Sequence, residues 1–391
     1  MASYYILKPL RDAYLLQSTD ITAVAKVHVV VAACTLATVQ VYAWLVRLVA
    51  GRSLSIWIYG SFVVTVVLFQ QALVRGVQVA HEVAFAWVFY VWVSIFSVFA
   101  VTVFWSLAHD IFTPEEGSEW YGLIGAADIL GGFVGGAVTT LLVSAVGLPN
   151  LLLVSAGMLI PCVGIASWLK AHAPSVRVKR DASTGGKLAA WPLFRSSPYL
   201  CAIFLFVFLF QGLSVLVDNQ ASLVVRANFH STEATARFKS NVYLGMNLVG
   251  FLLNVFVTGR LQTRFGPLPG MLAVPIAALF GALGFVWWPT IAVTVLVTVV
   301  GLAMGYSILQ SAKELLYLPV PSSERYVAKG FIDTFGFRLG NGLAAVWLWW
   351  LVPPLGSVSV CGAIFLASAG MIAAALWLAP RHSAMLETSS N

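Results

Sequence analysis

The stretch PEEGSEWYGLIGAADILGGFVG, residues 114–135, occurs a second time in this chain as PVPSSERYVAKGFIDTFGFRLG, residues 319–340. The two copies align without a gap at an offset of 205 residues, and eight of the 22 aligned positions are identical. The identical pairs are Pro114/Pro319, Ser118/Ser323, Glu119/Glu324, Tyr121/Tyr326, Gly125/Gly330, Asp128/Asp333, Gly131/Gly336 and Gly135/Gly340. This similarity indicates a chain made of two duplicated halves.

The composition is typical of a membrane protein. Hydrophobic residues make up 60% of the 391 residues, charged residues make up 9%, and the mean hydropathy is +0.90. In a soluble domain about a quarter of the residues are charged. The apolar runs are about 20 residues long, which is the length that a helix needs to cross a bilayer, and they lack the alternation of a membrane barrel. We therefore expect an all-α integral membrane protein.

Eleven apolar runs can span a bilayer. They lie near residues 25–46, 54–73, 84–109, 120–146, 150–169, 198–217, 240–258, 266–287, 290–312, 328–352 and 357–379. A twelfth candidate, residues 3–16, is short and contains Lys8, Arg11 and Asp12, which also interrupt any signal-peptide core. It is either an interfacial amphipathic helix or a first span shortened at its front. We favour the second interpretation, because a duplication requires equal halves.

The basic residues predict the topology. The connection at 170–197 contains Lys170, Arg177, Lys179, Arg180, Lys187 and Arg195, so it should be a cytoplasmic linker. It separates an N-terminal half, 1–169, from a C-terminal half, 198–391, and both termini should be cytoplasmic. Six spans in each half make the repeats parallel. That arrangement is typical of the major facilitator class, in which the substrate site lies where the halves meet.

Several other functions lack their motifs. Gly185, Gly186 and Lys187 do not complete a phosphate-binding loop. The four cysteines and six histidines have no metal-site spacing, and no nucleophile constellation is visible. We expect no enzymatic activity, no metal and no cofactor. The net charge of +7 is attributed to topology and not to nucleic-acid binding.

Charges within apolar spans are the candidate functional residues, because each costs about 2.5–3.5 kcal/mol at a helix centre. Besides Asp110, they are Lys8, Arg11, Lys313, Lys329 and Arg338 as candidate substrate-binding residues, and Asp12, Asp128, Glu314 and Asp333 as candidate gating or coupling residues. Lys329 and Asp333 are four residues apart, so they form a local ion pair or Lys329 contacts substrate. Arg338 can bind an anion or cap a neighbouring helix. The slight excess of cations favours an anionic solute.

Two further patterns concern packing. Gly131, Gly132, Gly135 and Gly136 predict close helix contacts. Aromatic stretches, such as the one with Phe89, Tyr90 and Trp92 or the pair Trp287 and Trp288, are expected mostly to face lipid or the membrane interface.

Four segments resemble the ATP/ADP translocase family, and most closely the translocase-like transporters of free-living bacteria. They are YYILKPLRDAY (4–14), FWSLAHDIF (104–112), TGRLQTRFG (258–266) and AKELLYLPVPSSERYVAKGFIDTFGFRLGNG (312–342). The resemblance implies a twelve-span nucleotide antiporter in the bacterial inner membrane. It further implies that Lys8 and Lys329 bind phosphates, with Lys313 and Arg338 in support.

The chain differs from the nucleotide exchangers at three places, one of which is the shortened front of its first span. Residues 90–104 contain no acidic residue where the exchangers have a glutamate, and Asn341 replaces a usual lysine. The expected function is alternating-access transport of an anionic solute such as ATP or ADP, by a monomer in a lipid bilayer. Two alternatives stay open: proton-coupled transport of another organic anion, drug or metabolite, and a non-transporting sensor or scaffold.

Overall fold

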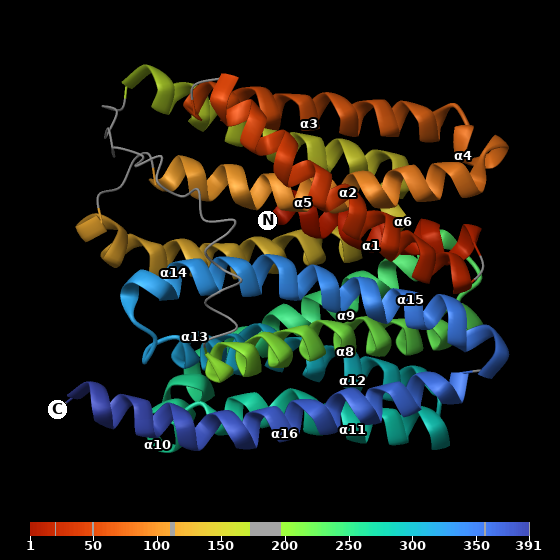
Figure 1. Ribbon diagram of the computed structural model, residues 1–391. Coiled ribbons are helices and arrows are strands. Elements are labelled where there is room, and N and C mark those ends of the chain that lie inside the picture. Colours follow the sequence, from red (N-terminus) through yellow and green to blue (C-terminus); the bar gives the residue numbers. More distant parts are fainter. Residues whose placement is uncertain (20, 49–50, 110–113, 173–196, 356, 391) are drawn as a thin grey trace. The chain divides into compact units, whose positions relative to one another are not determined.

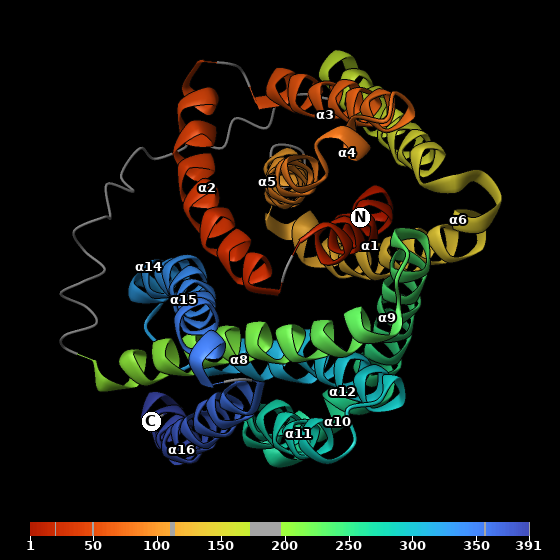
Figure 2. The same cartoon turned by 90° about the vertical axis from the view of Figure 1, so that its right-hand side faces the viewer.

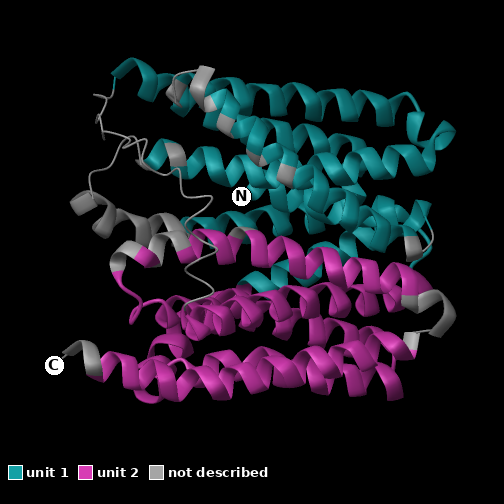
Figure 3. Ribbon diagram, viewed as in Figure 1, with its two compact units in different colours: residues 1–180, 229–247 teal, residues 181–228, 248–391 magenta. Residues whose placement is uncertain are grey.

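The computed structural model describes residues 1–19, 21–48, 51–109, 114–172, 197–355 and 357–390, and every regular element within these ranges is a helix. Asp110 and residues 173–196, which make up most of the expected basic linker, lie outside the described residues. The contacts between Cα atoms divide the chain into two compact units (Figure 3). Unit 1 comprises Met1–Arg180 with Phe229–Asn247, and unit 2 comprises Asp181–Asn228 with Leu248–Asn391.

Unit 1 is a bundle of helices (Figure 1). Its elements are α1 (Ala2–Ser18), α2 (Ile21–Leu48), α3 (Gly51–Val74), α4 (Val77–Ala80), α5 (Glu82–His109), α6 (Pro114–His172) and most of α9 (Thr232–Leu252). The 59 residues of α6 are interrupted at Gly147, where φ is 77° and ψ is 164°. Residues with a side chain rarely adopt this backbone conformation. The break separates two of the expected spans, 120–146 and 150–169.

Unit 2 is also a helical bundle, in which α8 packs against α12, α15 and α16. Its elements are α8 (Pro198–Asn228), the end of α9, η1 (Leu253–Thr258), α10 (Gly259–Phe265), α11 (Leu268–Trp287), α12 (Ile291–Met304), η2 (Gly305–Leu309), α13 (Gln310–Leu316), α14 (Ser322–Phe331), η3 (Ile332–Gly336), α15 (Phe337–Leu355) and α16 (Ser357–Ser390). The three η elements are short π-helical turns within longer helical runs. Such turns often occur at functional sites.

The expected number of spans agrees with the described helices. Nine of these helices are long and apolar enough to cross a membrane, and one of them contains both halves of α6. The three expected spans beyond these nine are α1, the second half of α6, and the run formed by α14, η3 and α15.

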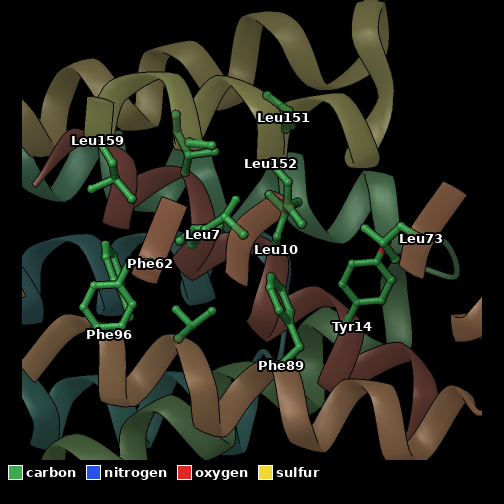
Figure 4. Packing of buried hydrophobic residues seen from close by; sticks show 14 of the residues in the cluster. Leu7, Leu10, Tyr14, Phe62, Leu73, Phe89, Phe96, Leu151, Leu152 and Leu159 are labelled. Carbon is green, nitrogen blue, oxygen red and sulfur yellow. The ribbon is translucent and has the colours of Figure 1, made fainter. Parts of the chain in front are cut away.

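Helix α1 lies in the interior of unit 1. It packs against α5 and α6, as the view along the helices shows (Figure 2). Ile6, Leu7 and Leu10 have no solvent exposure, and Figure 4 shows Leu7 and Leu10 among Phe89, Leu152 and other core side chains of α3, α5 and α6. A helix lying in the headgroup layer would keep one polar face in water. The interfacial interpretation of residues 3–16 is therefore wrong.

The duplicated glycines make equivalent contacts in the two units. A Cβ atom on Gly135 would collide with the carbonyl oxygen of Ala2 in α1, and one on Gly340 would collide with the carbonyl oxygen of Phe208 in α8. Only glycine permits such a close approach of two helix backbones. Close packing, predicted for the glycine run of α6, is thus confirmed at Gly135, and the second half repeats it.

The aromatic stretch of α5 does not face lipid. Phe89 is fully buried and Tyr90 is 6% exposed, whereas Trp287 and Trp288 are 65% and 64% exposed. Along α5, the Phe85 and Phe89 rings stack with centroids 5.8 Å apart. The expectation was wrong for Phe89 and Tyr90. Phe89 belongs to the hydrophobic core of unit 1, and Tyr90 contacts Arg11 of α1 and His28 of α2.

Candidate functional site

The charges of α1 form a cluster within unit 1, which we call the unit 1 cluster (Lys8, Arg11, Asp12 and Tyr243). The Lys8 Nζ atom lies 4.0 Å from the centroid of the Tyr243 ring and 5.6 Å from that of Tyr5. The face of an aromatic ring attracts a cation but does not neutralise it. These rings therefore stabilise Lys8 while its positive charge persists.

Arg11 and Asp12 are held by neighbouring helices. Arg11 donates from Nη1 to the Ser94 hydroxyl at 2.8 Å, and its Nε lies 3.2 Å from Oδ1 of Asp12. The Tyr243 hydroxyl donates to the other carboxylate oxygen of Asp12 at 2.6 Å. Hydrogen bonds thus connect α1 to α5 and α9. Since the cluster contains two cations and one carboxylate, it has a formal charge of +1.

In unit 2, four of the candidate residues form two ion pairs. The Lys313 Nζ atom lies 2.8 Å from Oδ1 of Asp333, and the Lys329 Nζ atom lies 2.6 Å from Oε2 of Glu314. The local pair predicted between Lys329 and Asp333 is therefore wrong. Asp333 lies in the π-helical turn η3, and the wider turn moves it out of the i, i+4 alignment of a regular helix.

Arg338 follows this turn, in α15. Its guanidinium carbon lies 5.3 Å from the centroid of the Phe337 ring, and no ion pair joins it to any other residue that the structure describes. We call the five charged candidates of unit 2, namely Lys313, Glu314, Lys329, Asp333 and Arg338, the unit 2 cluster. Its two ion pairs are formally neutral, and Arg338, five residues after Asp333 in the sequence, gives the set a formal charge of +1. The duplicate of Asp333, Asp128, is exposed on α6 and makes none of the hydrogen bonds given above.

Two partly open cavities near the candidate residues are lined by described residues of unit 2. The first, the α8–α12 cavity, has a volume of about 200 Å³ and polar lining residues Gln211, Ser214, Asp218, Thr298 and Gln310. The second, the Lys313 cavity, has a volume of about 240 Å³ and is lined by Lys313 and Asp333 among others. Phe210, Gln211, Gln310 and Phe337 line both, so the two cavities are neighbours.

Comparison with known proteins identifies the family. The model of the Major Facilitator Superfamily matches residues 1–345. The chain belongs to this superfamily. No curated protein sequence matches it.

Solved structures of other transporters share the fold of this major facilitator protein. The nucleoside transporter NupG has a TM-score of 0.61 at 15% identity, and 98% of each chain is covered. A bacterial homologue of the iron transporter ferroportin, in its inward-facing state, has a TM-score of 0.64 at 11% identity with 96% of each chain covered. A bacterial homologue of the human lysosomal transporter Spinster has 0.56 at 15% identity, with 98% of this chain and 96% of that chain covered. Sequence identities this low establish only that the fold is shared. The family and the apolar helices make the chain a multi-pass protein of the lipid bilayer.

Two residues that contribute to these sites, Asp218 and Tyr243, were not predicted from the sequence. Asp218 was missed because the predicted span ended at residue 217, whereas α8 continues to Asn228. The spacing of Gln211, Ser214 and Asp218 along one helix face was the available signal. Tyr243 had no such signal, because only folding brings it to Asp12.

The Tyr243→Phe variant should be less stable than the native protein. It keeps the ring beside Lys8 but removes the 2.6 Å hydrogen bond to Asp12. Hydrogen bonds to charged groups contribute about 1.5–3 kcal/mol, so the thermal unfolding midpoint should fall. Tyr306→Phe is the control, since Tyr306 is 63% exposed. Equal midpoints in both variants would contradict a structural role for the Tyr243 hydroxyl.

Proposed function

We propose that this protein is a secondary transporter that exchanges an anionic, phosphate-bearing solute of the ATP/ADP type by alternating access. The candidate substrate-binding residues are Lys8, Arg11, Lys313, Lys329 and Arg338. The candidate gating or coupling residues are Asp12, Asp128, Glu314 and Asp333. The halves at 1–169 and 198–391 are proposed to be the moving parts, joined by the linker at 170–197.

The observation that carries the proposal is the charge excess of the unit 2 cluster. Lys313 and Lys329 each have a carboxylate partner within 2.8 Å, and Arg338 adds a third cation. A net positive charge among apolar helices is costly without a counter-ion. An anion would supply that counter-ion, and phosphate oxygens match the planar donors of an arginine.

The ion pairs supply a physical basis for exchange. In the empty protein, Asp333 and Glu314 act as internal anions for the two lysines. A bound phosphate group competes for the same ammonium groups through charge-assisted hydrogen bonds. When the solute leaves, the carboxylates pair again with the two lysines, but Arg338 keeps its charge without a counter-ion among the described residues. Closing the empty protein around that charge is costly, so return to the other side would require a new anionic solute, which is the behaviour of an exchanger.

The fold does not select the solute, because its structural neighbours include nucleoside and iron transporters. The proposal of a nucleotide depends on the cation clusters and on the resemblance of the segments at 4–14 and 312–342 to the ATP/ADP translocases. We also propose that the protein is a monomer in the inner membrane of a bacterium and that both termini are cytoplasmic, since the basic residues favour that topology.

Proton coupling is a second candidate mechanism. Each of the two lysines of the unit 2 cluster has a carboxylate partner, and a carboxylate that loses its cation in a low-dielectric site binds a proton more readily. The solute would in that case move with a proton and without exchange.

Transport into liposomes tests the proposal. Purified protein is reconstituted in liposomes loaded with ATP, ADP, inorganic phosphate or buffer, and uptake of labelled ATP and ADP is measured with and without a pH gradient. We expect uptake only into liposomes that contain nucleotide. Uptake driven by a pH gradient into empty liposomes would favour the second mechanism. Absence of uptake in every condition would contradict nucleotide transport.

A further inference from the structure

The α8–α12 cavity differs in chemistry from the Lys313 cavity beside it. Its polar side is made of one carboxylate, two carboxamides and hydroxyl groups, from Asp218, Gln211, Gln310, Ser214 and Thr298. The remaining lining is aromatic or aliphatic, and no lysine or arginine is among its described lining residues. A cavity of this kind suits an uncharged or weakly basic group with hydrogen-bond donors.

The Thr298 hydroxyl is available to a ligand. Thr298 is 8% exposed, and its Oγ1 atom has no hydrogen-bond partner among the described residues. A helical threonine commonly donates to the carbonyl oxygen four residues earlier. Thr294 in the same helix does so, at 2.9 Å from the oxygen of Thr290. A buried hydroxyl without a partner costs about 1–3 kcal/mol, so a ligand group that bonds to Thr298 from within the cavity would be stabilised.

Glycine keeps one wall of the cavity open. A Cβ atom on Gly301 would have no atom within 4 Å, and one on Gly305 would touch the Phe210 ring at 3.4 Å. Both glycines line the cavity, together with Phe210, Phe337 and Tyr306. A cavity lined by aromatic rings together with amide, hydroxyl and carboxylate groups has features of a site for a planar ring with polar edges.

We infer that the α8–α12 cavity binds a planar heteroaromatic ring with N–H groups, and that this ring belongs to the solute whose anionic end lies at Lys313. Only the part of the inference that concerns the anionic end depends on the proposed function. The shared wall of Phe210, Gln211, Gln310 and Phe337 lets one molecule extend from one cavity to the other. Asp218 and the glutamines accept from amino N–H groups attached to the ring, and Thr298 donates to a ring nitrogen.

Three probes separate the two ends of such a solute. Adenosine has the ring and no phosphate, pyrophosphate has the anionic groups and no ring, and ADP has both. Binding of each to the purified protein is measured by calorimetry. Gly301→Leu fills part of the α8–α12 cavity without replacing a charged residue, and Thr298→Val removes the hydroxyl at nearly constant volume. Gly362→Leu is the matched control, since Gly362 is exposed on α16 with nothing within 4 Å of its Cβ position.

We expect Gly301→Leu to weaken adenosine binding about tenfold or more, because the side chain occupies the space of the ring. Thr298→Val should weaken it to a smaller extent, while pyrophosphate binding stays unchanged in both variants and Gly362→Leu binds all three probes normally. Failure of adenosine to bind, or equal binding by Gly301→Leu and Gly362→Leu, would overturn the ring site. If pyrophosphate still binds in a manner that depends on Lys313, the proposed function survives that result. Adenosine binding without any pyrophosphate binding would keep the ring site and contradict the phosphate site.

Discussion

Replacing Gly340 with alanine should strongly destabilise the protein. The new methyl group would meet the backbone oxygen of Phe208 and lie 3.0 Å from the Cβ atom of Gln211, so α8 and α15 would have to move apart. Overpacking of this kind costs about 1–3 kcal/mol, and more where backbone must shift. Gly135→Ala should have the same effect in unit 1, because its methyl group would meet the Ala2 carbonyl oxygen. The fraction of protein recovered as a monodisperse peak after extraction, and its thermal midpoint, measure the loss.

The control for both variants is Gly342→Ala in the same helix, α15. A Cβ atom there would have no neighbour within 4 Å. Alanine is favoured over glycine in a helix by about 1 kcal/mol, so this variant should be as stable as the native protein or slightly more so. If Gly340→Ala and Gly342→Ala have the same midpoint, the close contact of α8 with α15 is incorrect.

The Lys313→Ala variant should lose both transport and stability. Lys313 pairs with Asp333, and this is the more buried of the two ion pairs of unit 2. The side chains are 14% and 31% exposed. Removing one partner of a fully buried pair costs about 3–5 kcal/mol, because it leaves the other charge without compensation. The cost should be smaller for this half-buried pair, because solvent screens Asp333 in part. Uptake into liposomes should fall to background, since the cation that lines the Lys313 cavity is gone.

A second substitution separates the two effects. In Lys313→Ala combined with Asp333→Ala, both charges of this pair are removed, so the thermal midpoint should recover most of its loss while uptake stays at background. The pair of Lys329 with Glu314 has exposures of 40% and 41%. Exposed pairs contribute about 0–1 kcal/mol, so Lys329→Ala should lose uptake with little change in stability. Recovery of uptake in the double variant would argue against Lys313 as an anion-binding residue.

Much of the architecture could be predicted because the signals are local. A run of about 20 apolar residues specifies a spanning helix wherever it occurs, and the glycine run that contains Gly135 predicts close helix packing. Span ends were less accurate. The run at 198–217 ended where Asp218 begins a polar stretch, although α8 continues for another eleven residues. The backbone bonds of a helix continue through polar residues when neighbouring helices cover them.

The partners of the charges could not be predicted in this way. The spacing of Lys329 and Asp333 suggested a pair on one helix, but the π-helical turn and the nearby helix α13 gave each residue a different partner. Tyr243 lies 231 residues from Asp12 along the chain, and their hydrogen bond has no sequence signal. Hydrophobic periodicity also does not tell a lipid-facing aromatic residue from a buried one, as Phe89 and Tyr90 demonstrate.

The sequence by itself determined the membrane class, the two repeats, the helical spans and the set of charges that a bilayer would make costly. These follow from composition and spacing, because the solvation of each segment in a bilayer depends mainly on its own residues. Only the tertiary structure decided that α1 belongs to the core, which cation pairs with which carboxylate, and that two cavities of different chemistry adjoin at Phe210 and Phe337. Those features depend on side chains that are distant in sequence, and short-range electrostatic and packing forces act only after folding has brought them together.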